Sequence, residues 1–208
     1  MIKDSRVLTV IRARQNGSSP NIGFGGYSEG LSDDVNKVVW SLLAAEPYLS
    51  VEQVVRQYAR YHFGSEHQDA MAAAIFGLEE NWAGDIGSNQ AVRQTLAAIQ
   101  TVEAAVTGAE LHANWRLLAL LYRAYFDAHV QARFRFEMQQ QENAYRALGR
   151  APAAGSAQAA AAALAALNTT NHDVEAAGWH LGTTFYGKNS IPVGSQSAQH
   201  AVFSGAYS

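Results

Sequence analysis

The chain has 208 residues, of which 48% are hydrophobic and 16% are charged. This composition is typical of a globular protein with a buried core and excludes a disordered chain. The formal net charge of −3, from 15 basic and 18 acidic residues, argues against charge-driven binding to nucleic acid or to a membrane surface. The sequence contains no cysteine, which excludes disulfides, thiolate zinc sites and a cysteine nucleophile.

No apolar run in the sequence approaches the ~20 residues that span a bilayer, so we expect no membrane association. The first residues, MIKDSR, contain no apolar stretch of the kind found in a signal peptide. The sequence leaves the localisation unknown, and without a signal peptide the chain as written is expected to be cytoplasmic.

Residues 1–31 differ from the rest of the chain. Residues 7–11 (VLTVI) are β-prone, residues 16–20 (NGSSP) break regular structure, and residues 23–30 are too rich in glycine for a helix. We therefore expect an extended, irregular N-terminal arm that leads into a helix.

From Ser32 onward, helix signals dominate. Ser32 can cap a helix whose first turn carries Asp33 and Asp34, the favourable charges for that end of the helix dipole. Apolar residues then recur on one helical face up to Pro47: Val35, Val38, Val39, Leu42 and Leu43.

Two capping boxes predict the next two helices. The first pairs Ser50 with Gln53, and its helix is expected to end at Gly64. The second pairs Ser65 with Gln68 and precedes an apolar stripe that reaches Trp82. A fourth helix is expected from residue 88 or 89 to about residue 108.

The longest predicted helix covers residues 109–148, roughly 60 Å at 1.5 Å per residue. Its heptad seam consists of Leu111, Trp115, Leu118, Tyr122, Tyr125, His129, Ala132 and Phe136. The seam is widened by Leu117, Leu121, Ala124 and Ala128, so we expect a central helix with neighbours on more than one side. Arg123 and Asp127 form an i, i+4 pair.

Residues 151–167 contain 11 alanines among 17 residues. Alanine is the best helix former and Pro152 suits a first turn, so we expect a sixth helix. A seventh should start at Thr170 or Asn171, and residues 188–208 should form a flexible tail. The sequence thus predicts an all-α bundle of about seven helices over residues 32–187.

Three carboxylates are the first catalytic candidates. Glu29, Asp33 and Asp34 lie within six residues, where a glycine-rich loop enters a helix. A pair of carboxylates with different pKa values is what glycoside hydrolysis requires. The alternative, which helix starts generally favour, is that the two aspartates are first-turn charges and Glu29 is solvated.

Histidines are the second candidates. His62 and His67 flank a predicted helix–helix junction that also contains Glu66 and Asp69, so the loop could assemble a zinc site. No zinc signature such as HExxH is present, and His62 also suits a hydrogen-bonded core position. Nucleophile and phosphate-loop motifs (GxSxG, SxxK, GxxxxGK[ST]) are absent.

Residues 26–40 (GYSEGLSDDVNKVVW) resemble a segment of large bacterial glycoside-hydrolase-like proteins, in which a (β/α) barrel precedes an all-helical domain. Residues 58–64 (YARYHFG) and 121–127 (LYRAYFD) resemble further stretches of the same region. The resemblance implies that residues 27–34 leave the last barrel strand and that Glu29, Asp33 and Asp34 face the barrel mouth.

A complete barrel needs about 200 residues upstream of this segment, and about 23 are present. We therefore expect a helical domain fragment with a carbohydrate-binding or packing role. The alternative is a small, possibly zinc-dependent hydrolase of activated esters or phosphoesters. A complete glycosidase site around Glu29 ranks last, because one loop cannot supply both sides of a glycosidic bond. The apolar surface that such a fragment exposes predicts a homodimer.

Overall fold

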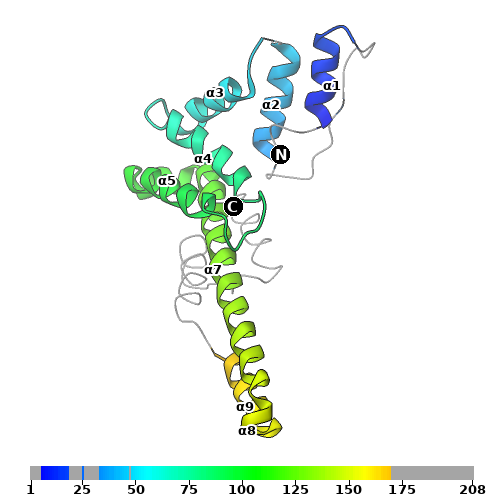
Figure 1. Cartoon of the computed structure of the whole chain (residues 1–208). Coiled ribbons are helices and arrows are strands. Elements are labelled where there is room, and N and C mark those ends of the chain that lie inside the picture. Colours follow the sequence, from blue (N-terminus) through cyan, green and yellow to red (C-terminus); the bar gives the residue numbers. More distant parts are fainter. Residues whose placement is uncertain (1–5, 19–24, 26–32, 47, 170–208) are drawn as a thin grey trace. The chain divides into compact units, whose positions relative to one another are not determined.

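The computed structural model describes residues 6–18, 25, 33–46 and 48–169, and these residues form nine helices and no strand (Figure 1). The helices are α1 (Arg6–Gln15), α2 (Asp34–Ala45), α3 (Val51–Phe63), α4 (Gln68–Glu80), α5 (Ala91–Ala105), α6 (Gly108–Ala113), α7 (Trp115–Gly149), α8 (Ala151–Ala154) and α9 (Ser156–Leu167). The predicted all-α class with one long helix is confirmed.

The chain divides into two compact units. The first contains residues 1–80 and 97–121, and within it α1 packs on α2, α2 on α3, and α3 on α4. The second contains residues 81–96 together with the chain from residue 122 onward. Helices α5 and α7 each contribute residues to both units.

Helix α3 is built as its sequence predicts. The Ser50 hydroxyl accepts a hydrogen bond from the Gln53 backbone at 3.1 Å, and the Gln53 side chain accepts one from the Ser50 backbone at 2.8 Å. Gly64 ends the helix with a φ of +92°, a backbone conformation that favours glycine. The apolar stripe is the buried side of α3: Val51, Val54, Val55, Tyr58, Ala59 and Phe63.

The prediction of an extended N-terminal arm is wrong for residues 6–15, which form α1. The β-prone residues 7–11 carry only a weak local preference, which tertiary contacts readily override. Ile11 is buried and α1 packs on α2, so burial of one side of this segment favours the helix. Residues 16–18 follow α1 as a turn, and of the remainder of the arm only Gly25 is described.

The predicted boundaries of the next helices shift by a few residues. Helix α2 begins at Asp34 and Asp33 is its N-cap residue, whereas Ser32 and Pro47 lie outside the described residues. The predicted capping box at Ser65 is wrong: residues 65–67 form a turn and α4 begins at Gln68. The Ser65 hydroxyl donates to the neighbouring Glu66 carboxylate at 3.4 Å instead of capping the helix.

The long helix begins at Trp115, not at residue 109, because a short helix precedes it. Helix α6 starts with a capping box between Thr107 and Glu110. Asn114 then separates α6 from α7, and its side-chain oxygen accepts a hydrogen bond from the Leu117 backbone at 3.2 Å. This bond satisfies one of the free N–H groups at the start of α7.

The buried side of α7 is rotated from the predicted seam. Leu117, Leu121 and Ala124, which were expected to widen the seam, are almost fully buried. The seam residues Trp115, Leu118, Tyr122 and Tyr125 are half-buried and Ala132 is exposed, whereas His129 of the seam is buried. The buried side continues through two polar residues, Asp127 and Gln131, which an apolar pattern search does not include.

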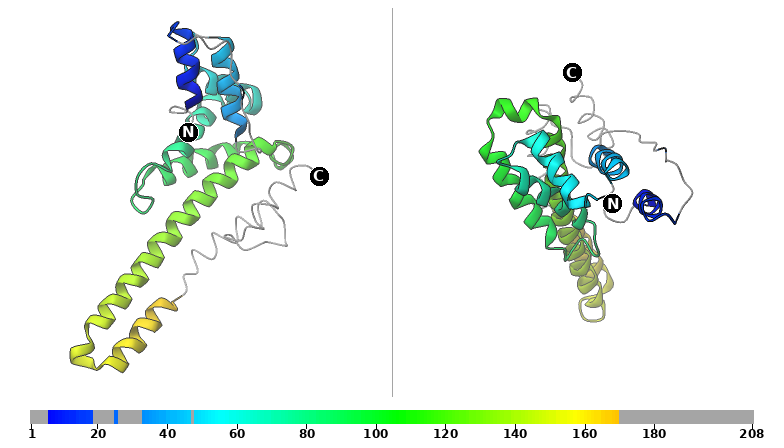
Figure 2. Two further views of the ribbon diagram at one scale, coloured as in Figure 1. Left: turned by 90° about the vertical axis from the view of Figure 1, so that its right-hand side faces the viewer. Right: turned by 90° about the horizontal axis from the view of Figure 1, so that it is seen from above.

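The alanine-rich segment forms two helices instead of one. Gly155, with a φ of +87°, separates α8 from α9, and Pro152 occupies the first turn of α8 as predicted. Helix α9 runs back along the last turns of α7 (Figure 2), with Ala144, Ala159 and Ala163 buried. The predicted seventh helix and the tail lie outside the described residues.

Candidate functional site

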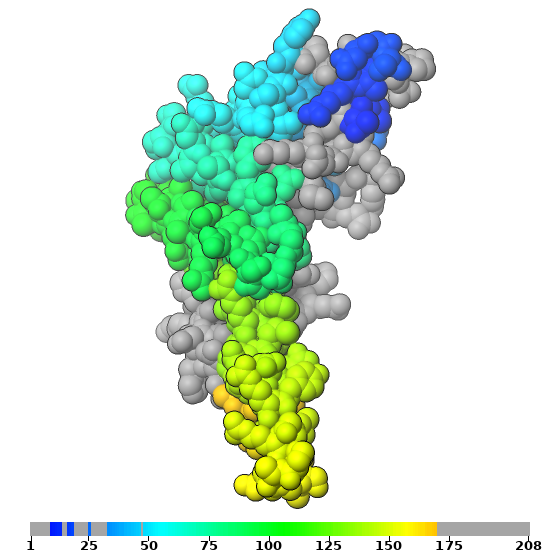
Figure 3. Space-filling view, in the orientation of Figure 1, coloured from blue at the N-terminus to red at the C-terminus, as the bar shows by residue number. Residues whose placement is uncertain are grey.

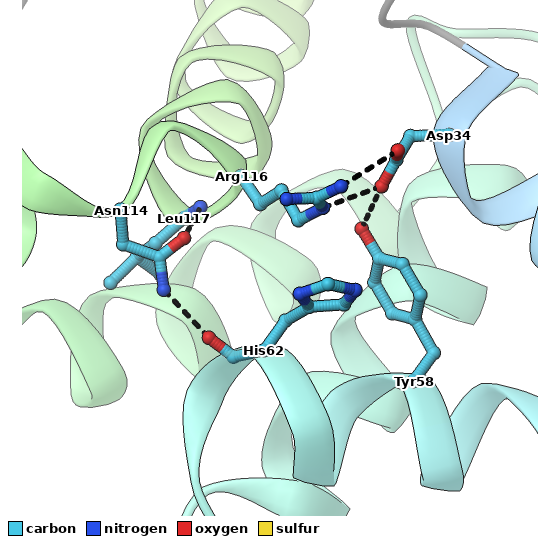
Figure 4. Close-up of polar contacts among 6 residues, drawn as sticks. All are labelled: Asp34, Tyr58, His62, Asn114, Arg116 and Leu117. Atoms are coloured by element: carbon cyan, nitrogen blue, oxygen red, sulfur yellow. Dashed lines mark hydrogen bonds and ion pairs between the residues drawn. The ribbon is translucent and has the colours of Figure 1, made fainter.

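The most extensive polar cluster in the first unit surrounds Asp34, in the first turn of α2 (Figure 4). Its Oδ2 accepts hydrogen bonds from the Tyr58 hydroxyl of α3 at 2.6 Å and from Nε of Arg116 of α7 at 2.7 Å. Its Oδ1 accepts a third from Nη2 of Arg116 at 3.1 Å. One carboxylate therefore joins α2 to α3 and α7, through partners that lie 24 and 82 residues after Asp34 in the sequence.

The cluster keeps Asp34 ionised. Burial acts to raise the pKa of Asp34, but the hydrogen bonds from Arg116 and Tyr58 outweigh this effect and lower that pKa below its usual value. Burial and the neighbouring carboxylate raise the pKa of Tyr58, so its hydroxyl stays a donor at all physiological pH values. The Arg116 side chain is 26% exposed and that of Asp34 is 22% exposed, so the pair lies partly in solvent.

His62 lies beside this cluster without joining it by a hydrogen bond. Its ring centroid is 4.5 Å from that of Tyr58 and 4.8 Å from that of Tyr61. Burial and the charge of Arg116 lower the pKa of His62, which favours the neutral imidazole. The backbone carbonyl of His62 accepts a hydrogen bond from the Asn114 side chain at 2.7 Å, which links the end of α3 to the start of α7.

The predicted catalytic carboxylates are not brought together among the described residues. Both oxygens of Asp34 accept hydrogen bonds from Arg116 or Tyr58, and its lowered pKa disfavours both a general-base and a general-acid role. Asp33 is the N-cap residue, and it accepts a 3.4 Å hydrogen bond from Asn36. Glu29 lies outside the described residues. The geometry favours the alternative in which the aspartates of this helix start are structural.

The described residues do not provide a complete set of ligands for the predicted zinc site. Across residues 33–46 and 48–169, and the other positions that the structure describes, no three His, Asp or Glu side chains are close enough to hold a metal ion. His62 and His67 therefore have no described third ligand, and a structural or catalytic zinc requires at least three protein ligands.

A second cluster, in the other unit, surrounds the buried Asp127 of α7. Asp127 is 1% exposed and accepts hydrogen bonds from the Asn81 amide at 2.9 Å and from Nε of Arg123 at 2.9 Å. Burial raises its pKa, and the bonds from Asn81, Arg123 and Trp82 oppose that rise. The Arg123 guanidinium lies 4.6 Å from the ring centroid of Trp82, which is 57% exposed. Only the Arg123–Asp127 pair was predicted from spacing.

The sequence pattern missed Tyr58, Arg116, Asn114 and Asn81 as members of these clusters. Tyr58 was assigned to an apolar stripe, and the partners of Asp34 lie too far along the chain for any local spacing rule. Asn114 did leave a signal, because asparagine before a helical apolar pattern is a typical N-cap.

No family model, curated protein or solved structure matches this chain. None of the described helices is long and apolar enough to cross a membrane.

Proposed function

We propose that this chain is a helical packing domain that docks through one apolar face of the α7–α9 hairpin. The face comprises six large side chains between 38% and 62% exposed: Phe134, Met138, Tyr145 and Leu148 on α7, and Leu164 and Leu167 on α9. This face is the observation that carries the proposal. Side chains of this kind are normally covered when they form one contiguous surface.

The six side chains share one side of the hairpin. Successive residues of an α-helix are rotated by about 100° around its axis. On both α7 and α9, the exposed apolar residues are rotated by roughly 100° from the buried alanines, and the direction of this rotation is the same on the two helices. The two helices run antiparallel (Figure 2), so equal rotations place both stripes on the same side. The opposite side carries polar residues and alanine, including Gln139, Asn143, Arg146 and Gln158.

The charged clusters support packing over catalysis. Asp34 and Asp127 are both committed to hydrogen bonds and ion pairs within the chain. Those of Asp34 join α2 to α3 and α7, and those of Asp127 join α7 to the turn at Asn81. The descent from glycoside-hydrolase-like proteins remains part of the proposal and rests on the resemblance of residues 26–40.

Radical footprinting of the purified chain tests the docking role. Tyr145 is 62% exposed and Tyr61 is 84% exposed, so a free face predicts labelling of Tyr145 at roughly three-quarters of the Tyr61 rate. If the face is docked, Tyr145 and Met138 should label several-fold more slowly than this. Met71, which is fully buried, gives the protected limit. Labelling of Tyr145 at the free rate at all accessible concentrations would refute docking.

Carbohydrate binding at Trp82 is a second candidate. The indole of Trp82 is 57% exposed and the Arg123 side chain beside it is 44% exposed, so the indole can stack a sugar ring and the guanidinium can bind its hydroxyl groups. Calorimetry against a panel of oligosaccharides tests this, with Trp82→Ala as the variant that should lose binding. Absence of heat with every member of the panel would eliminate the candidate.

A further inference from the structure

We infer that the occupant of the α7–α9 face is a second copy of this chain, packed with its α7 antiparallel to the first α7 about a twofold axis near Gln141. This inference rests on the docking role proposed above and names the partner. It also specifies the register, and it is independent of the sugar site at Trp82.

The apolar stripe of α7 reads nearly the same in both directions. Phe134 and Met138 lie seven and three residues before Gln141, and Tyr145 and Leu148 lie four and seven residues after it. An antiparallel twofold pair about Gln141 therefore places Phe134 against Leu148 of the second copy, and brings Met138 to within one residue of the level of Tyr145. A twofold interface requires self-complementarity, and the apolar residues at both ends of this stripe meet that requirement.

Burial of this stripe leaves no charge without a partner. None of its five positions on α7 is charged, and the two polar members already interact, since the Gln141 amide donates to the Tyr145 hydroxyl at 3.3 Å. The arginines and glutamates of this part of α7 pair beside the stripe, as in Arg133–Glu137 and Arg146–Glu142. Desolvation of the face thus buries no charged side chain of the stripe itself.

The exposed area is large enough for a stable pair. With roughly 200 Å² for each large side chain, the exposed fractions of the six residues amount to about 600 Å² per chain. Two copies would bury about 1,200 Å², the lower limit of a specific protein–protein interface. The last turns of α7 form an open surface on the side seen in Figure 3.

The pairing of two copies gives the α7–α9 hairpin a buried apolar core, which a single hairpin cannot form. Two antiparallel helices with alanines between them bury little apolar surface, so their large side chains remain in water. Two hairpins face to face give a four-helix bundle, in which the stripes of α7 and α9 become the core.

The test measures the mass of the full chain by sedimentation across concentrations, with variants on the two sides of the hairpin. Leu148→Lys and Leu164→Lys place a charge in the face, and Gln139→Lys places the same charge on the polar side. We expect wild type and Gln139→Lys to be dimers at micromolar concentration. The two face variants should dissociate at least tenfold more readily, with unchanged helical content by circular dichroism.

Footprinting of Tyr145 and Met138 on the same samples separates this inference from the docking role. A monomer with a protected face would overturn the second copy and leave docking intact, with residues 170–208 as the occupant. A monomer with an unprotected face would overturn both. A dimer that the face variants leave unchanged would place the interface elsewhere and overturn the inference.

Discussion

Replacement of Arg116 by glutamine should destabilise the first unit, because the guanidinium makes two of the three hydrogen bonds to Asp34. Hydrogen bonds to charged groups contribute about 1.5–3 kcal/mol each, and breaking a fully buried pair costs about 3–5 kcal/mol. About a quarter of each side chain is exposed, which screens the pair, so we expect a loss of about 2 kcal/mol in the free energy of unfolding. For a chain of this size, that corresponds to a Tm lower by roughly 4–8 °C.

Urea denaturation followed by circular dichroism measures this loss. Arg146→Gln is the matched control, because Arg146 also bonds a carboxylate through Nε, at 3.0 Å, but both side chains of that pair are more than half exposed. The control should lose no more than about 0.5 kcal/mol. A double-mutant cycle with Asp34→Asn should give a coupling of at least 1 kcal/mol. If Arg116→Gln is no more destabilising than Arg146→Gln, the structural role of Asp34 is refuted.

Three further predictions concern single positions. Asn114→Ala should cost about 1 kcal/mol in a urea titration, because it removes both the cap of α7 and the bond to the His62 carbonyl; an unchanged midpoint would contradict this. The pKa of Asp34 is lowered in the folded state, so its stabilising contribution is present above the unfolded value near 3.9 and is lost as pH falls through the folded value. Wild type should therefore lose more stability than Asp34→Asn between pH 5 and pH 2, and parallel pH profiles would count against the cluster. Gly155→Ala should cost about 1–3 kcal/mol through backbone strain alone, since φ is +87° and no atom lies within 4 Å of the new Cβ; an unchanged Tm would show that the break between α8 and α9 relaxes.

Local sequence patterns predicted the helix boundaries correctly where residues within the same few positions determine them. The capping box at Ser50, the glycine at 64 and the proline in the first turn of α8 act within four residues, and each was predicted. The pattern failed where a local preference was weak, as at residues 7–11, or where one glycine divided an otherwise uniform alanine segment. Neither error changes the fold class, which depends on the summed periodicity of many segments.

The candidate site was less predictable because its partners are distant in the sequence. Asp34 was selected as a carboxylate at a helix start, and that position was correct. What the residue does depends on Tyr58 and Arg116, which only the packing of α3 and α7 brings to it. The rotation of the α7 stripe has a similar origin: Asp127 and Gln131 lie on its buried side because each finds a hydrogen-bond partner in residues 81–90, which an apolar period cannot encode.

The most direct test of the central claim is a cross-link between two copies at the expected twofold axis. The chain has no cysteine, so Gln141→Cys introduces a single thiol in the α7–α9 face, and Gln139→Cys introduces one on the polar side of the same helix turn. Under mild oxidation, we predict rapid formation of a disulfide-linked dimer by Gln141→Cys and little by Gln139→Cys. Equal and slow cross-linking of the two variants would contradict the self-association of this face.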